Sequence, residues 1–145
     1  MSGAARRVPT QSLAPAALPD DGYVAGVCNI GPWEIRRRRT FAIVGFVIAA
    51  LVLAGLVASH AAPIARAVVL LPLWGGMFSW LQARRRFCAG FAFASISNFG
   101  AGDASRRSVV DEAAHRADMV AVARMTRDSF LLALPITVAA ILLPL

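Results

Sequence analysis

FAIVGFVIAALVLAGLVAS, residues Phe41 to Ser59, is the stretch that decides the fold of this chain. These nineteen residues contain no charge and no proline, and the helix they would form has no polar face. At 1.5 Å per residue such a helix covers roughly 28 Å, close to the ~30 Å hydrocarbon core of a bilayer. The stretch therefore predicts a transmembrane helix over residues 41–59.

A second apolar block, AVVLLPLWGGMFSWLQ, runs from Ala67 to about Gln82. It contains Pro72 and the pair Gly75-Gly76, which membrane helices tolerate because neighbouring groups satisfy the freed backbone. Only a short link joins it to the first block. We therefore expect a second transmembrane helix over about 67–82, antiparallel to the first, in a hairpin over residues 35–86.

The last apolar block, SFLLALPITVAAILLPL over residues 129–145, is at the lower limit of length for a span. It predicts a third transmembrane helix, because the alternative, a helix lying in the membrane surface, needs a polar face that this block lacks. The fold class expected is an all-α membrane protein with one helical membrane domain over 23–145.

The segment between the second and third spans, residues 87–128, is expected on the cytoplasmic side. Its apolar part, 87–99, is too short to cross a membrane and is expected at the interface or beneath the hairpin. Residues from about Ser108 to Asp128 predict a helix, with Ser108 and Asp111 as a capping box.

The composition supports a membrane protein. The chain has 145 residues, 58% of them hydrophobic, and a mean hydropathy of +0.63, which is too apolar for a soluble fold of this size. All fifteen basic residues are Arg, and together with the abundant Ala this indicates a GC-rich bacterial source. No secretory signal is apparent, and the Pro/Ala-rich residues 1–22 predict a disordered cytoplasmic tail.

The arginines predict the orientation. If the N-terminus is cytoplasmic, fourteen of the fifteen arginines lie on that side and only Arg66 lies outside. We therefore expect a bacterial inner-membrane protein with its N-terminus in the cytoplasm and its C-terminus outside. The net charge of +7 is then better explained by topology and by anionic lipid headgroups than by nucleic acid. The headgroup contacts are expected from two clusters that bracket the hairpin: Arg36, Arg37, Arg38 and Arg39, and Arg84, Arg85 and Arg86.

Two cysteines flank the hairpin. Cys28 precedes the first span and Cys88 follows the second, so both are expected at the same cytoplasmic level, where they could meet. One interpretation is a thiol pair that is redox-active or shares a metal with other ligands. The other is two small apolar side chains packed at an interface. No cofactor follows from the sequence.

Small residues recur at helical spacing in both spans, which lets helix backbones approach closely within the hairpin or against a partner. The candidates are Gly45 with Ala49, then Ala50, Ala54 and Ala58 in the first span, and Gly75 with Ser79 in the second.

The segment Cys28-Asn29-Ile30-Gly31-Pro32-Trp33-Glu34-Ile35-Arg36-Arg37, followed by the hairpin and Phe87-Cys88, resembles the YgaP-like two-helix inner-membrane domain, which is sometimes fused to a rhodanese. The resemblance covers about residues 29–88. It implies that Asn29, Gly31, Glu34 and Arg37 form a structured start to the first helix. The chain departs from the family in having Ala89 where a proline follows the cysteine, a third helix and no rhodanese domain, so sulfur transfer is not carried over.

No Gly-rich phosphate loop, nucleophile elbow, paired carboxylates or HExxH motif occurs in the sequence, and the three apolar blocks carry no charged residue. The leading hypothesis is a non-enzymatic scaffold or accessory subunit that packs against a larger membrane complex or against itself. The alternative is a membrane-anchored thiol, redox or metal-handling protein that uses Cys28 and Cys88. A third reading is a protein that binds anionic lipid through its arginines.

Overall fold

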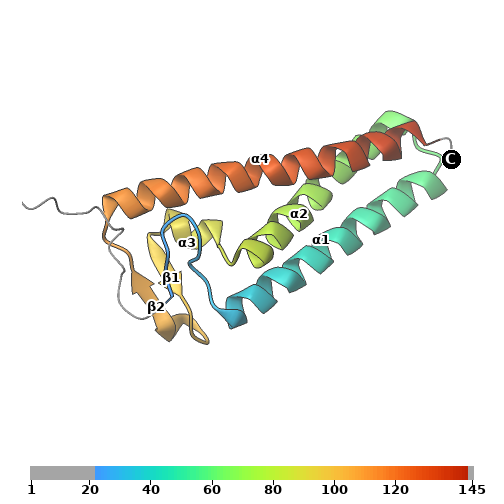
Figure 1. Cartoon of the computed structure of the whole chain (residues 1–145). Helices are drawn as coiled ribbons and strands as arrows, with labels where there is room; N and C mark the ends of the chain where they lie inside the picture. The colour runs from blue at the N-terminus through green and yellow to red at the C-terminus, as the bar shows by residue number, and fades with distance from the viewer. Residues whose placement is uncertain (1–21, 144–145) are drawn as a thin grey trace, which may run out of the picture.

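Three long helices form the body of the protein in the computed structural model, which describes residues 22–143. Helix α1 spans Pro32–Ala58, α2 spans Leu70–Arg85 and α4 spans Glu112–Leu142. A 3₁₀ helix, η1 (Pro63–Val69), leads directly into α2. In Figure 1, α1 and α4 run away from the end that carries the small sheet, and α2 returns between them. The expected tail lies outside the described residues, apart from residue 22.

The expectation of three membrane-spanning helices is confirmed as far as length and composition go. Residues 32–58, 63–85 and 112–142 are each long and apolar enough to cross a membrane. Helix α1 begins well before its apolar stretch, because Gly31 is its N-cap and Pro32 opens its first turn. It ends at Ala58 with Ser59 as its C-cap, and the positive φ of 50° at His60 turns the chain toward η1.

Helix α4 corrects the prediction for the C-terminal third of the chain. The helix expected over 108–128 and the span expected over 129–145 are one continuous helix of 31 residues that passes through Pro135. Its N-cap is Asp111, whose carboxylate accepts hydrogen bonds from the backbone N–H groups of Ala113 and Ala114, both at 3.2 Å. Ser108 ends a strand instead, so the capping box was wrong.

The all-α expectation is also wrong at one end of the molecule. The apolar segment 87–99 contains a short helix, α3 (Ala89–Phe93), and a strand, β1 (Ile96–Asn98). Strand β1 pairs antiparallel with β2 (Arg106–Ser108), and the turn between them holds the 3₁₀ helix η2 (Asp103–Ser105). We call residues 22–31 and 86–111, together with the part of α4 that packs on them, the cap.

The hydrophobic core has separate parts in the cap and among the helices. In the cap, Phe87 and Ala92 pack against Val122 and Met125 of α4. Among the helices, Ala49 of α1 packs with Val69, Leu73 and Ala133. The segment 87–99 thus supplies the interior of a folded cap.

Candidate functional site

Asn29 joins the two sides of the cap at the start of α1. Its side-chain amide donates to the carbonyl of Cys88 at 3.0 Å, and its amide oxygen accepts from the backbone N–H of Cys88 at 2.6 Å. Its own backbone N–H donates to the carbonyl of Arg86, and its carbonyl accepts from Asn98. Asn29 is fully buried, so all of these bonds lie out of water. The residue fixes the chain before α1 to the chain after α2.

Gly31 is held against the neighbouring loop. Its N–H donates to the carbonyl of Asn98 at 2.8 Å, and a Cβ atom at this position would overlap the backbone of Phe99. Glu34 follows in the first turn of α1, where a carboxylate is favoured by the helix dipole. It is 1% exposed, and one of its oxygens lies 3.7 Å from Nη1 of Arg37. Of the residues named from the YgaP-like resemblance, Asn29 and Gly31 are bonded to Asn98 of the neighbouring loop, and Glu34 is paired with Arg37 on α1.

The two cysteines are free thiols with different surroundings. Cys88 is fully buried, and Nη2 of Arg38 donates toward its Sγ at 2.9 Å. Cys28 is half-buried, with the carbonyl of Ile30 3.9 Å from its Sγ. Among residues 22–143, no group of three or more His, Cys, Asp or Glu side chains lies close enough to hold a metal ion.

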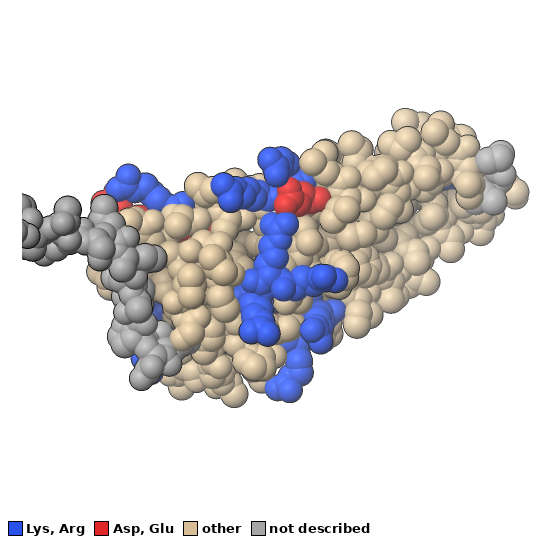
Figure 2. All heavy atoms as spheres, in the orientation of Figure 1, with Lys and Arg blue, Asp and Glu red and all other residues tan. Residues whose placement is uncertain are grey.

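Arginines lie on all three long helices where the cap begins. We call this set the arginine belt: Arg36 to Arg39 on α1, Arg84 to Arg86 at the end of α2, and Arg124 and Arg127 on α4. Figure 2 shows arginine side chains as a band across one face of the molecule, with an uncharged surface on the side toward the C-terminus. The first two clusters are apparent in the sequence, and α4 supplies the remaining arginines of the belt.

Ion pairs and aromatic rings hold parts of the belt in place. Arg85 bridges α2 to α4 through Asp128, with Nη2 and Oδ2 2.7 Å apart. Arg84 lies 5.1 Å from the centre of the Trp80 ring. On α1, the guanidinium groups of Arg37 and Arg38 lie 5.6 and 6.0 Å from the centre of the Phe41 ring. Aromatic side chains beside cations are typical of a membrane–water interface.

A second polar contact ties the first described residues to α4. Asp118 is 2% exposed, and its carboxylate accepts hydrogen bonds from the hydroxyl of Tyr23 at 2.9 Å and from the N–H of Gly26 at 2.6 Å. Burial, and then the hydrogen bond and negative charge of Asp118, raise the pKa of Tyr23 above its usual range. The phenol is therefore neutral at physiological pH and serves as a donor. The sequence does not predict this pair, because no local pattern links residues so far apart.

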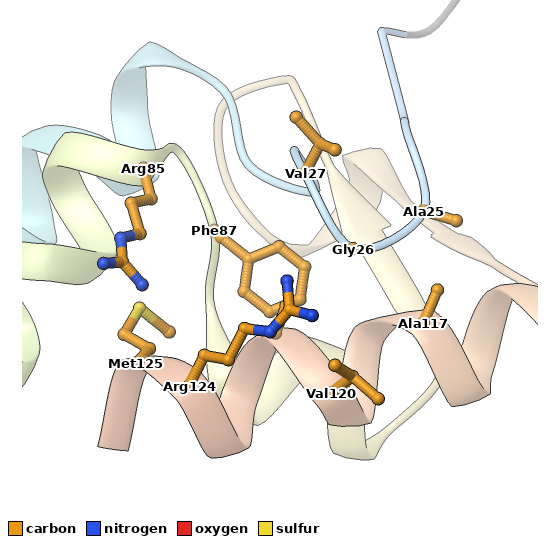
Figure 3. Close-up of a pocket in the computed structure, with 10 residues that line it drawn as sticks. Ala25, Gly26, Val27, Arg85, Phe87, Ala117, Val120, Arg124 and Met125 are labelled. Carbon is orange, nitrogen blue, oxygen red and sulfur yellow. The ribbon is translucent and has the colours of Figure 1, made fainter. Parts of the chain in front are cut away.

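A cavity of about 620 Å³ lies between the first loop, the end of α2 and α4. In Figure 3, Arg85 and Arg124 reach toward it from two helices, with Phe87 and Met125 between them and Gly26 on the loop side. Its volume is in the range of small-molecule sites. Apolar walls with two guanidinium groups suit an anionic group on an apolar body.

The small residues divide between the inside and the outside of the molecule. Gly45 makes the close approach of α1 to α2, since a Cβ atom there would lie 2.8 Å from Cα of Gly76. Gly76 was not singled out from the sequence, and a Cβ atom at its neighbour Gly75 would meet nothing within 4 Å. Ala49 is buried against α2, η1 and α4, and Ser79 is half-buried. The remaining candidates, Ala50, Ala54 and Ala58, are exposed.

Arg66, at the end of the helices opposite the belt, has a structural role that the sequence did not suggest. It is 3% exposed, and its Nη1 donates to the carbonyls of Ala140 and Leu143 at 3.1 and 2.9 Å. These carbonyls belong to the C-terminal end of α4, where a cation is favoured by the helix dipole. Arg66 thereby ties η1 to the end of α4.

No known protein family, no curated protein and no solved structure matches this chain. The resemblance to the YgaP-like domain therefore stays a prediction.

Proposed function

We propose that the protein is a non-enzymatic accessory subunit that packs through α1 against a transmembrane helix of a larger membrane complex. One observation carries this proposal: α1 has two rows of small residues, and only one is used inside the chain. Ala42, Gly45 and Ala49 face α2, whereas Ala50, Ala54 and Ala58 form a second row that is exposed. Without a hydrophobic driving force between helices in lipid, small residues are what allow close helix packing.

The bilayer placement proposed here puts the cap and the arginine belt in the cytoplasm of a bacterial inner membrane. The belt concentrates positive charge at one end of three apolar helices, and Arg66 is the only arginine described at the other end. The positive-inside rule then assigns the cap to the cytoplasm and the C-terminal end of α4 to the outside. Anionic headgroups of the inner leaflet would neutralise the belt.

The test of the accessory role is native purification in mild detergent, followed by mass spectrometry of everything that co-migrates. The informative variant is Ala54→Leu, which blocks the exposed row. The control is Ala139→Leu, which adds the same bulk to an exposed alanine on α4. We expect a defined set of larger membrane subunits with the wild type and the control, and their loss with Ala54→Leu. A strictly monomeric wild-type protein without partners would refute the proposal, and a self-complex lost in Ala54→Leu would replace the larger complex with a second copy.

A second candidate function is thiol chemistry at the cap, favoured by the contact between Arg38 and Cys88. This contact places a guanidinium nitrogen 2.9 Å from the sulfur that would react. Cys88 is fully buried, so this function needs the cap to open. Thiol alkylation of the intact protein tests it. Modification of Cys88 as fast as Cys28 would support the thiol function, and modification of Cys88 only after unfolding would end it.

A further inference from the structure

A shallow groove runs along the hairpin between α1 and α2, on the membrane side of the arginine belt. Its volume is about 390 Å³. Small residues on both helices make room for it, because Gly45 and Gly76 bring the backbones together and Gly75 has open space where a side chain would be. Phe41, Val44 and Ile48 of α1 and Pro72 of α2 are among the residues that form its walls. The groove is therefore apolar along its length.

An arginine stands at one end of the groove. Arg38 lines it, and both Arg37 and Arg38 have their guanidinium groups within about 6 Å of the Phe41 ring that forms the wall next to it. A guanidinium group has five N–H donors, and the hydrogen bond described for Arg38 uses only Nη2, toward Cys88. Its Nε is buried and has no hydrogen-bond partner. The Nη1 group of Arg38 makes none of the hydrogen bonds described here, and it is the donor for an anion at the mouth of the groove.

The length of the groove matches one leaflet of a bilayer. From Arg38 to Ile48, α1 rises about 15 Å, which is half of the ~30 Å hydrocarbon core. Spread over that length, 390 Å³ gives a mean cross-section of about 26 Å². An α-helix is about 10–12 Å across, so a partner helix would lie over the groove without filling it. It suits a single extended hydrocarbon chain.

We propose that this groove holds one acyl chain of an anionic phospholipid, with the lipid phosphate hydrogen-bonded to Arg38. The proposal rests on the membrane placement given above but not on the accessory role. Around α1, the groove residues Val44 and Ile48 lie about 80–160° from Ala50 and Ala54, and Ile48 is the last α1 residue of the groove, so a lipid here leaves Ala54 and Ala58 free. The cavity of Figure 3 is a weaker candidate, because its Arg85 is already paired with Asp128.

The experiment is native mass spectrometry of the purified full-length protein titrated with phosphatidylglycerol, and in parallel with phosphatidylcholine of the same acyl chains. Arg38→Gln removes the headgroup contact, and Arg39→Gln removes an equal charge from an exposed neighbour in the belt. Gly75→Leu fills the groove, and Gly55→Leu adds the same side chain at the other glycine in these spans whose Cβ atom would meet nothing within 4 Å.

We expect one phosphatidylglycerol per chain, with affinity lowered about tenfold by Arg38→Gln, as for the loss of one charge-assisted bond. Gly75→Leu should abolish retention, whereas Arg39→Gln and Gly55→Leu should bind within about twofold of wild type. Thermal melting establishes that each variant is folded, and Gly75→Leu keeps the test valid if Arg38→Gln disturbs the cap. Equal retention of phosphatidylcholine, or equal effects of Gly75→Leu and Gly55→Leu, would overturn the proposal.

Discussion

The cap is held together around buried polar groups, whereas α1 and α2 beyond the arginine belt approach each other most closely through small residues. In the cap, Asn29 and Asp118 are almost fully buried and each accepts or donates several hydrogen bonds across distant segments. Beyond the belt, the close contact of α1 with α2 is made by Gly45 and Gly76. The proposed membrane placement, with the cap in water and the helices in lipid, accounts for this difference. Buried polar bonds specify a fold in water, and small residues allow close packing where lipid gives no hydrophobic drive.

The largest effect is expected from Gly31→Ala in the cap. The new methyl group would overlap the backbone of Phe99, which cannot move without breaking the bond between Gly31 and Asn98. We expect a loss of about 3 kcal/mol in the free energy of unfolding, measured by thermal melting in detergent. Gly90→Ala is the matched control, because its methyl group would make only an ordinary contact with the Cys88 sulfur at 3.8 Å. Equal stability of the two variants would show that the cap is not tightly packed at this point.

A smaller effect is expected at the opposite end from Arg66→Met. The change keeps much of the side chain and leaves the carbonyls of Ala140 and Leu143 without this donor. Hydrogen bonds to a charged group contribute about 1.5–3 kcal/mol. We therefore expect the free energy of opening the C-terminal end of α4 to fall by about 2 kcal/mol. Hydrogen exchange of the backbone amides of residues 139–143 measures this free energy directly, and Arg39→Met is the control at an exposed position. Unchanged exchange would mean that the end of α4 needs no cap.

Tyr23→Phe removes one hydrogen bond of the cap without changing its shape, at an expected cost of about 1 kcal/mol. The pKa of Tyr23 is raised in the folded protein, so its contribution is complete below the unfolded pKa of about 10 and is lost as the pH rises toward the folded value. Wild-type stability should therefore fall above about pH 10 more steeply than that of Tyr23→Phe. Tyr23 is the only tyrosine, so absorbance of the phenolate reports its titration alone. A midpoint near pH 10 in the folded protein would contradict the buried contact.

The smallest effect is expected from Trp74→Phe, which deletes a bond of the same kind between helices. The indole N–H of Trp74 donates to the hydroxyl of Ser129 at 3.0 Å. Side-chain bonds between membrane helices contribute about 0.6 kcal/mol on average, and Phe preserves much of the packing. The pair of variants Tyr23→Phe and Trp74→Phe therefore compares one hydrogen bond in each region. A larger loss of unfolding free energy for Trp74→Phe than for Tyr23→Phe would reverse the comparison between the cap and the helices.

The helices could be predicted from the sequence because their signal is local. The run from residue 41 to residue 59 has a length and an apolarity that only a buried or membrane helix explains. The same local pattern wrongly predicted two helices that meet at Ser129, because charged residues give way to apolar ones there. The backbone of α4 is helical on both sides of this residue. Composition reports the surroundings of a helix and says little about where it begins or ends.

The cap could not be predicted because its contacts join residues far apart in the chain. The strands β1 and β2 have three residues each, too few for a periodic pattern, and the Asp118 contacts reach back more than ninety positions to Tyr23 and Gly26. The start of α1 was named only through a family resemblance. Gly75 was chosen in place of Gly76 because spacing alone cannot tell which of two adjacent glycines faces the neighbouring helix.

The placement of the cap on one side of a membrane and of η1 on the other is tested most directly by cysteine labelling. In a Cys28→Ser background, where Cys88 is buried, Ala104→Cys marks the cap and Ala62→Cys marks the opposite end, both at exposed positions. A membrane-impermeant maleimide is applied to right-side-out and to inverted membrane vesicles. Labelling of Ala62→Cys only in right-side-out vesicles, and of Ala104→Cys only in inverted ones, is the predicted result. Labelling of both positions from the same side would contradict the account.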